Sequence, residues 1–162
     1  MARKKTWNEK LHDAKDLPKV ITVEPETGSR WPVGRYVVPA PVDVDAVMRG
    51  IPRRKLMTTE GLRQALAARY ETDFACPLTT GIFSWIAAQA AVEAEESGAV
   101  RGGRGTPWWR TLKTGGELNP KFPGGPDRQR QLLEAEGHEV VTKGKKYVVL
   151  NYSKSLYQPA SK

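Results

Sequence analysis

The residues best suited to binding chemistry form one short stretch, Trp108-Trp109-Arg110, with Glu136 further along the chain. Exposed indoles stack on nucleobases for about 1 to 3 kcal/mol each, although an aromatic pair can equally be buried in a core. We expect a mixed arrangement, in which one ring packs inward and Trp108 lines a cleft. Arg110 either binds phosphate or braces its turn. Glu136 either reaches into the cleft or is a structural acid at a helix end.

Other reactive or metal-binding groups are sparse. Cys76 is the single cysteine, and His12 and His138 are the two histidines, so no spacing fits a disulfide or a zinc site. Cys76 precedes Pro77 and has no histidine in its motif, which indicates a small buried residue rather than a nucleophile. His12 and His138 are interpreted as surface residues. We therefore predict that the protein uses no metal and no cofactor.

Basic residues are concentrated in particular parts of the chain. Residues 1–20 carry six Lys or Arg against three acids, residues 101–130 seven against two, and residues 138–162 five against one, whereas residues 40–100 carry six against eight. With a net charge of +8, this pattern fits a protein that meets a polyanion, and a solubilising surface is the alternative. Without a signal peptide or a run of about 18 apolar residues, we expect a cytoplasmic protein with no membrane partner.

Periodicity and capping residues predict the order of elements. Helices are expected over about 42–50, from an N-cap at Thr58 to about residue 70, and from Thr79 or Thr80 to Gly98, the last burying Ile82. These helices fit either a helix-turn-helix, with its recognition helix near Thr79, or a plain three-helix core. A further helix is expected between Asp127 and Gly137.

The remaining segments predict a wing and two flanking extensions. Two β-runs around Lys143-Gly144-Lys145 fit a hairpin or wing. The expected fold class is α/β, with a winged helix-turn-helix core, a small β-hairpin and an extended N-terminal segment. We divide the chain into an extension over 1–38 that packs on the domain, the domain itself over 39–152, and a basic tail over 153–162.

Several motifs, in the correct order, carry a resemblance to a known family. Residues 107–110 read Pro-Trp-Trp-Arg, two Gly-Gly pairs stand at 115–116 and 124–125, and residues 132–137 read Leu-Leu-Glu-Ala-Glu-Gly. Over about residues 40–150 the chain resembles the C-terminal DNA-binding domain of O6-alkylguanine-DNA alkyltransferases. That family has Pro-Cys-His-Arg, a Gly-Gly pair and Leu-Leu-x-x-Glu-Gly in this order. Residues 51–58 look like its turn before the second helix of the helix-turn-helix.

The departures from the family pattern set the expected function. Trp108 stands where the family has its nucleophilic cysteine, and an indole offers no thiolate, so the resemblance implies no alkyl transfer and no enzyme. The same replacement marks the alkyltransferase-like proteins, which bind alkylated guanine in DNA and attract nucleotide excision repair. Trp109 replaces the histidine of the family's relay, and only Glu136 remains in place. The family's phosphate-contacting tyrosine aligns with Thr59, and its base-replacing arginine aligns with Thr80.

The resemblance, closest to a divergent bacterial branch, implies a non-catalytic, cytoplasmic or nucleoid-associated DNA-binding protein. We expect it to recognise alkylated or damaged bases and to flag them for repair proteins. The alternative is a winged-helix module that binds RNA or a protein partner without base flipping, which the loss of both flipping residues favours. Threonine hydroxyls here can simply cap a helix, and the wing lysines can simply be solvated. The predicted base pocket is Trp108, Trp109, Arg110 and Glu136. The predicted nucleic-acid contacts are Thr59, Arg63, Thr79, Thr80, Ser84, Arg101, Arg104, Lys143, Lys145 and Lys146.

Overall fold

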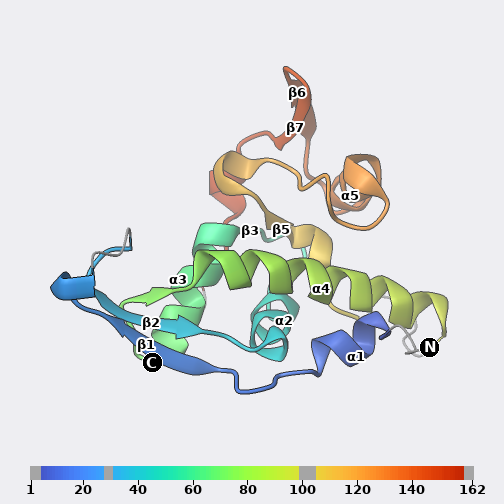
Figure 1. Ribbon diagram of the computed structural model, residues 1–162. Coiled ribbons are helices and arrows are strands. Elements are labelled where there is room, and N and C mark those ends of the chain that lie inside the picture. The colour runs from blue at the N-terminus through green and yellow to red at the C-terminus, as the bar shows by residue number, and fades with distance from the viewer. Residues whose placement is uncertain (1–4, 28–30, 99–104, 159–162) are drawn as a thin grey trace.

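The computed structural model describes residues 5–27, 31–98 and 105–158 of the chain. The lower part of Figure 1 holds helices α1 to α4 with strands β1 and β2, and the upper part holds α5 and a β-hairpin. The predicted α/β fold class is confirmed. The helices are α1 (Trp7–Leu11), α2 (Pro41–Arg49), α3 (Thr59–Arg69), α4 (Pro77–Glu96) and α5 (Gly125–Ala135). The strands are β1 (Lys19–Val23), β2 (Gly34–Val38), β3 (Met57–Thr58), β4 (Phe74–Ala75), β5 (Thr111–Leu112), β6 (Val140–Lys143) and β7 (Lys146–Val149).

Three small sheets connect these helices. In the first sheet, β2 pairs with β1 in antiparallel orientation and with β4 in parallel orientation. In the second, β3 pairs with β5 in parallel orientation, which brings the start of α3 next to the segment after the tryptophan pair. The third is the antiparallel β6–β7 hairpin, in which Lys143 faces Lys146 across a turn that contains Gly144. This hairpin confirms the predicted wing.

The helix-turn-helix consists of α3 and α4. Thr58 caps α3 as predicted, because its hydroxyl accepts a hydrogen bond from the Gly61 N–H at 3.2 Å. The predicted start of α4 at Thr79 or Thr80 is wrong. The helix begins at Pro77 with Cys76 as N-cap, because proline fits the first helical turn, where its missing N–H costs nothing.

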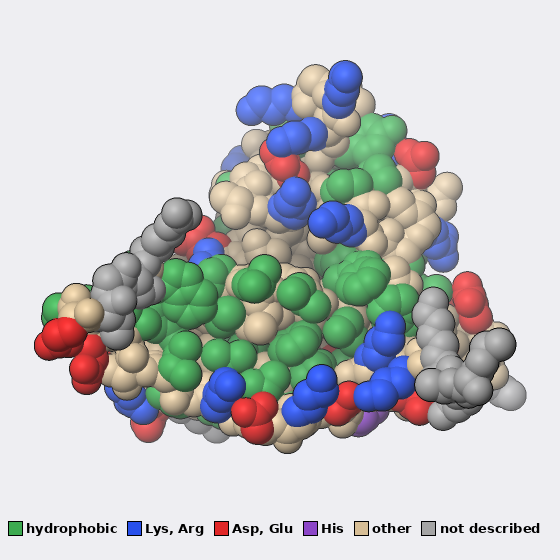
Figure 2. All heavy atoms as spheres, in the orientation of Figure 1, with side chains coloured by type: hydrophobic (Ala, Val, Ile, Leu, Met, Phe, Trp, Pro, Cys, Tyr) green, Lys and Arg blue, Asp and Glu red, His purple; other side chains and the backbone are tan. Residues whose placement is uncertain are grey.

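The outward face of α4 is also more apolar than expected. Ile82, predicted to be buried, is 44% exposed, and Leu78 one turn earlier is 68% exposed. Figure 2 shows hydrophobic side chains spread across the middle of this face, in the region that α4 crosses in Figure 1. Of the helices in the described ranges, none has both the length and the hydrophobicity to cross a membrane.

Two buried clusters meet at the tryptophan pair. The larger cluster fills the lower part of the molecule and includes Val37, Leu62 and Trp108. The smaller cluster lies under α5 and the hairpin and includes Leu112 and Leu133. Trp109 packs against both clusters, so the 3₁₀ turn Trp108–Arg110 joins the two parts of the fold.

Helix α5 begins at a glycine rather than at the predicted acidic cap. Gly124 is its N-cap in a left-handed conformation (φ 78°), and a Cβ at this position would lie 2.6 Å from Cβ of Arg128. Asp127 lies within the first turn, where it interacts favourably with the helix dipole. The predicted end is confirmed, since the helix stops before Gly137, which has a φ of 92°.

Candidate functional site

A cleft of about 760 Å³ lies between α4, α5 and the tryptophan turn. Its volume falls in the range of about 300–1,000 Å³ that is typical of small-ligand sites. Both indoles of the predicted pocket belong to its wall. The cleft is lined by Ala91, Val92, Glu95, Glu96, Gly105, Thr106, Trp108, Trp109, Pro123, Gly124, Asp127, Arg128, Gln131 and Leu132.

The two tryptophans are arranged edge to face. Their ring centroids are 5.9 Å apart with the planes at 88°, and Phe122 packs against Trp108 in the same way at 5.7 Å. Trp108 is only 3% exposed, whereas Trp109 is partly exposed. The expectation that Trp108 is the accessible ring is therefore corrected, because Phe122 and the larger core enclose it. Trp109 is the more accessible of the two rings.

Gln129 fixes the backbone beneath this pair. Its fully buried side-chain amide donates to the carbonyl oxygens of Trp109 and Thr111, both at 3.1 Å, and accepts from the Asn119 N–H at 2.9 Å. Sequence reasoning missed this residue. The available signal was its position four residues before the buried Leu133, which places a polar side chain on the inward face of α5.

Asp45 fixes the other side of the turn. Its carboxylate accepts a hydrogen bond from the buried Thr106 hydroxyl at 2.6 Å and forms an ion pair with Arg49 at 3.3 Å. Thr106 lines the cleft and directly precedes the proline of the tryptophan motif. The wall of the cleft is thus held by buried polar groups from α2 and α5, which makes it a preformed site.

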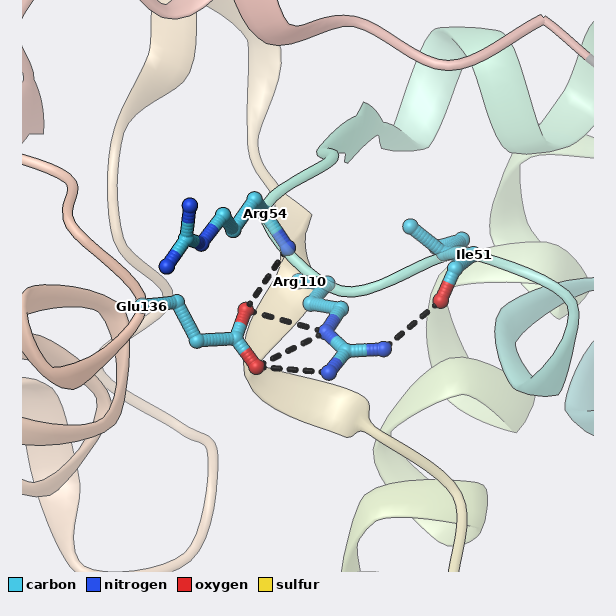
Figure 3. Close-up of polar contacts among 4 residues, drawn as sticks. All are labelled: Ile51, Arg54, Arg110 and Glu136. Atoms are coloured by element: carbon cyan, nitrogen blue, oxygen red, sulfur yellow. Dashed lines mark hydrogen bonds and ion pairs between the residues drawn. The ribbon is translucent and has the colours of Figure 1, made fainter.

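Arg110 and Glu136 form a buried ion pair rather than a part of the cleft (Figure 3). Arg110 Nη2 lies 2.6 Å from Glu136 Oε2, and Arg110 Nε donates to both carboxylate oxygens at 3.0 and 3.1 Å. Arg110 Nη1 donates to the Ile51 carbonyl at 2.8 Å, and the Arg54 N–H donates to Glu136 at 3.4 Å. These bonds fit the alternatives of an arginine that braces its turn and a structural acid, and the predicted place of both residues in the base pocket is corrected.

The environment of the ion pair sets two pKa values. Burial alone would raise the pKa of Glu136, but the hydrogen bonds and positive charge of Arg110 outweigh burial and hold that pKa below its ordinary value. Burial lowers the pKa of His138, against the opposing effect of Glu136. His138 is half-buried, so its interpretation as a surface residue is corrected, whereas His12 is exposed as expected.

No thiol faces the cleft. Cys76, the single cysteine of the sequence, is buried at the N-cap of α4, and the cleft lining is drawn from other residues. In the part of the chain that the structure describes, no group of His, Cys, Asp and Glu side chains could hold a metal ion. The cleft lining presents the Trp108 and Trp109 indoles together with charged side chains of α4 and α5.

The predicted nucleic-acid contacts on α4 are mostly inaccessible. The buried hydroxyls of Thr80 and Ser84 donate within the helix, to the Cys76 carbonyl at 2.7 Å and to the Gly81 carbonyl at 2.8 Å. They therefore cannot serve as phosphate contacts. The Thr79 hydroxyl oxygen is also buried, and it has no hydrogen-bond partner within the described residues.

The other predicted contacts lie on different elements. Thr59 and Arg63 are partly exposed on the first two turns of α3, and Lys143 and Lys145 are exposed on the hairpin. Lys146 is exposed and lies 3.4 Å from Glu117. Arg101 and Arg104 lie outside the described residues. Figure 2 shows Lys and Arg side chains gathered around and below the hairpin, above the hydrophobic side chains in the middle of this face.

The α3–α4 helix pair and the β6–β7 hairpin form the winged helix-turn-helix that the sequence predicts. Comparison with solved structures confirms the predicted resemblance at the level of the fold. The chain is similar to S. pombe Atl1 in complex with damaged DNA containing O6-carboxymethylguanine, with a TM-score of 0.50 and 20% identity. The match covers 74% of this chain and 94% of Atl1.

A second S. pombe ATL structure, also in complex with DNA, matches with a TM-score of 0.44 and 21% identity over the same shares of the two chains. No family model matches the sequence, and no curated protein matches it either. At 20% identity, the likeness to Atl1 establishes a shared fold and no more.

Proposed function

We propose that the protein binds DNA without catalysis and accepts an alkylated or otherwise damaged base in the cleft beside Trp109 and Trp108. The observation that carries this proposal is the cleft itself, a preformed cavity of about 760 Å³ with two indoles in its wall. A planar base can stack on an indole, and each such contact stabilises a complex by about 1 to 3 kcal/mol.

Two further observations support binding rather than alkyl transfer. Trp108 stands where the resemblance places the nucleophilic cysteine, and the single cysteine lies buried at the start of another helix. A thiolate is the required acceptor for an alkyl group in such chemistry, and the lining of this cleft supplies none. The fold is shared with Atl1, a protein solved with damaged DNA.

The positions of the charged groups support separate sites for the base, in the cleft, and for the DNA backbone, on the surface. Lys143 and Lys145 on the hairpin and Arg63 on α3 are accessible cations outside the cleft lining. Phosphate contacts by such residues supply affinity that depends on salt but not on sequence, whereas the base is selected inside the cleft. We propose that a complex of this kind then presents the damaged base to repair proteins.

The test is a fluorescence anisotropy titration with two duplexes of the same sequence, one intact and one with a central O6-methylguanine. The slope of log K against log salt should be negative, about −0.9 times the number of phosphates engaged, and the alkylated duplex should bind more tightly. An absence of binding at low salt, or a salt-independent affinity, would favour the alternative of a module for a protein partner. Tighter binding to structured RNA than to either duplex would favour an RNA module.

A pair of variants tests the role of the cleft directly. Trp109→Leu should weaken binding to the alkylated duplex by about 1 to 3 kcal/mol and affect the intact duplex much less. Trp85→Leu is the matched control, because Trp85 is also a partly exposed indole but packs against Trp7 and lies outside the cleft. Melting curves establish that both variants are folded. Equal losses in the two variants would contradict the assignment of the cleft.

A further inference from the structure

The charged side chains that the described residues place around the cleft are mostly acidic, whereas the chain as a whole is basic. The sequence has a net charge of +8, but the ionisable side chains that residues 5–27, 31–98 and 105–158 contribute to the cleft lining are Glu95, Glu96, Asp127 and Arg128. Three carboxylates thus face one guanidinium. Arg128 Nη1 also donates to Gln131 at 3.3 Å, so part of its hydrogen-bonding capacity is used within α5.

Helix α4 adds to this negative potential. Glu95 and Glu96 occupy its last turn, which contains no basic residue. The C-terminal end of a helix carries the negative end of the helix dipole, where a carboxylate is destabilising and a cation is favoured. The sequence therefore places two acids where local electrostatics disfavour them, and departures of this kind are typical of functional sites.

The aromatic walls favour a cation as well. The face of an indole attracts positive charge, and this region already holds two such contacts. Lys10 Nζ lies 4.3 Å from the ring centroid of Trp7, and the Arg110 guanidinium lies 5.4 Å from that of Trp109. Trp7 lines a neighbouring cavity of about 550 Å³, which shares Val92, Glu96, Pro123 and Gly124 with the main cleft.

From these observations we propose that the cleft selects a purine whose ring carries a fixed positive charge, such as one alkylated at N7, over a neutral purine. The inference rests on the proposed function in that it takes the ligand to be a nucleobase. The carboxylates repel phosphate, so the base enters while its backbone stays on the basic surface outside. Trp109, the more accessible indole, contacts the ring face, and Glu95, Glu96 and Asp127 stabilise its charge.

The experiment uses free nucleosides, so that its outcome does not depend on DNA binding. Tryptophan fluorescence of the full chain is titrated with 7-methylguanosine and with guanosine in mildly acidic buffer, in which the methylated ring keeps its positive charge. We expect 7-methylguanosine to bind roughly tenfold more tightly, because each pairing of the ring charge with an exposed carboxylate contributes up to about 1 kcal/mol and the contact with the indole adds to it.

Matched variants distinguish an effect of the acids in the cleft on nucleoside binding from an effect of the protein's net charge. The double substitution Glu95→Gln and Glu96→Gln should remove most of this preference. Glu139→Gln should keep it, since Glu139 is an exposed acid outside the cleft lining. Equal affinity of the wild-type protein for both nucleosides would overturn the inference, as would tighter binding of a trimethyllysine peptide than of 7-methylguanosine. The salt titration on duplex DNA tests the proposed function separately, so either can fail while the other stands.

Discussion

The ion pair between Arg110 and Glu136 gives the sharpest test of how the site is held. In the variant Glu136→Gln, the side chain keeps its shape but loses its charge, and an amide N–H replaces one acceptor oxygen. That N–H would face the N–H groups of the Arg110 guanidinium, so two hydrogen-bond donors would point at each other with no acceptor between them. Arg110 and Glu136 are only 13% and 7% exposed, so water can replace little of the lost interaction.

The expected loss in the free energy of unfolding is about 3 kcal/mol, since removal of one partner of a buried ion pair typically costs about 3–5 kcal/mol and glutamine keeps part of the hydrogen bonding. The pair also holds the turn before α3, in which Arg54 has a left-handed backbone (φ 70°) and donates to Glu136. Urea unfolding followed by circular dichroism measures the difference. The control is Glu134→Gln, whose more exposed pair with Arg130 should contribute less than about 1 kcal/mol.

The same pair predicts a pH dependence with a definite sign. The pKa of Glu136 is lower in the folded protein than its ordinary value, so the unfolded chain takes up the proton first as pH falls. The stabilisation is therefore fully present above the ordinary glutamate pKa and is lost as pH falls through the folded value. The difference between wild type and Glu136→Gln should shrink over that range. A loss below about 1 kcal/mol at neutral pH, or a difference that does not change with pH, would refute this account.

Three further outcomes are expected. Gln129→Leu should lower the free energy of unfolding by about 3 kcal/mol, because it leaves the Asn119 N–H and two carbonyls without their partner. Urea unfolding measures this loss, and a difference from wild type no larger than the experimental error would contradict the prediction. Trp108→Ala should cost about 3–5 kcal/mol, since its ring is enclosed, and an unchanged melting temperature would mean that the ring is not part of the core. Lys145→Ala should leave stability within about 0.5 kcal/mol and reduce the salt slope of DNA binding by about one, while an unchanged slope would remove the hairpin from the interface.

Local signals in the sequence were sufficient for several elements. Each of these elements is specified by residues only a few positions apart in the sequence. They are the N-cap at Thr58, the apolar spacing of Leu62 and Leu66, and the turn at Gly144. Such short-range geometry is fixed by backbone hydrogen bonds and side-chain periodicity, so α3 and the hairpin could be predicted. The start of α4 was missed where two local signals competed, since Pro77 and the threonine hydroxyls both mark helix starts.

The composition of the site was decided only in three dimensions. The sequence alone establishes that residue 108 carries an indole, which offers no thiolate to an alkyl group. It could not assign Glu136 to Arg110, 26 residues away, or to the Arg54 N–H, 82 residues away. Nor could it place the last turn of α4 and the first turn of α5 around one cleft, where the described residues contribute Glu95, Glu96 and Asp127. Contacts of this range depend on how helices pack, and packing is a property of the whole core rather than of any single motif.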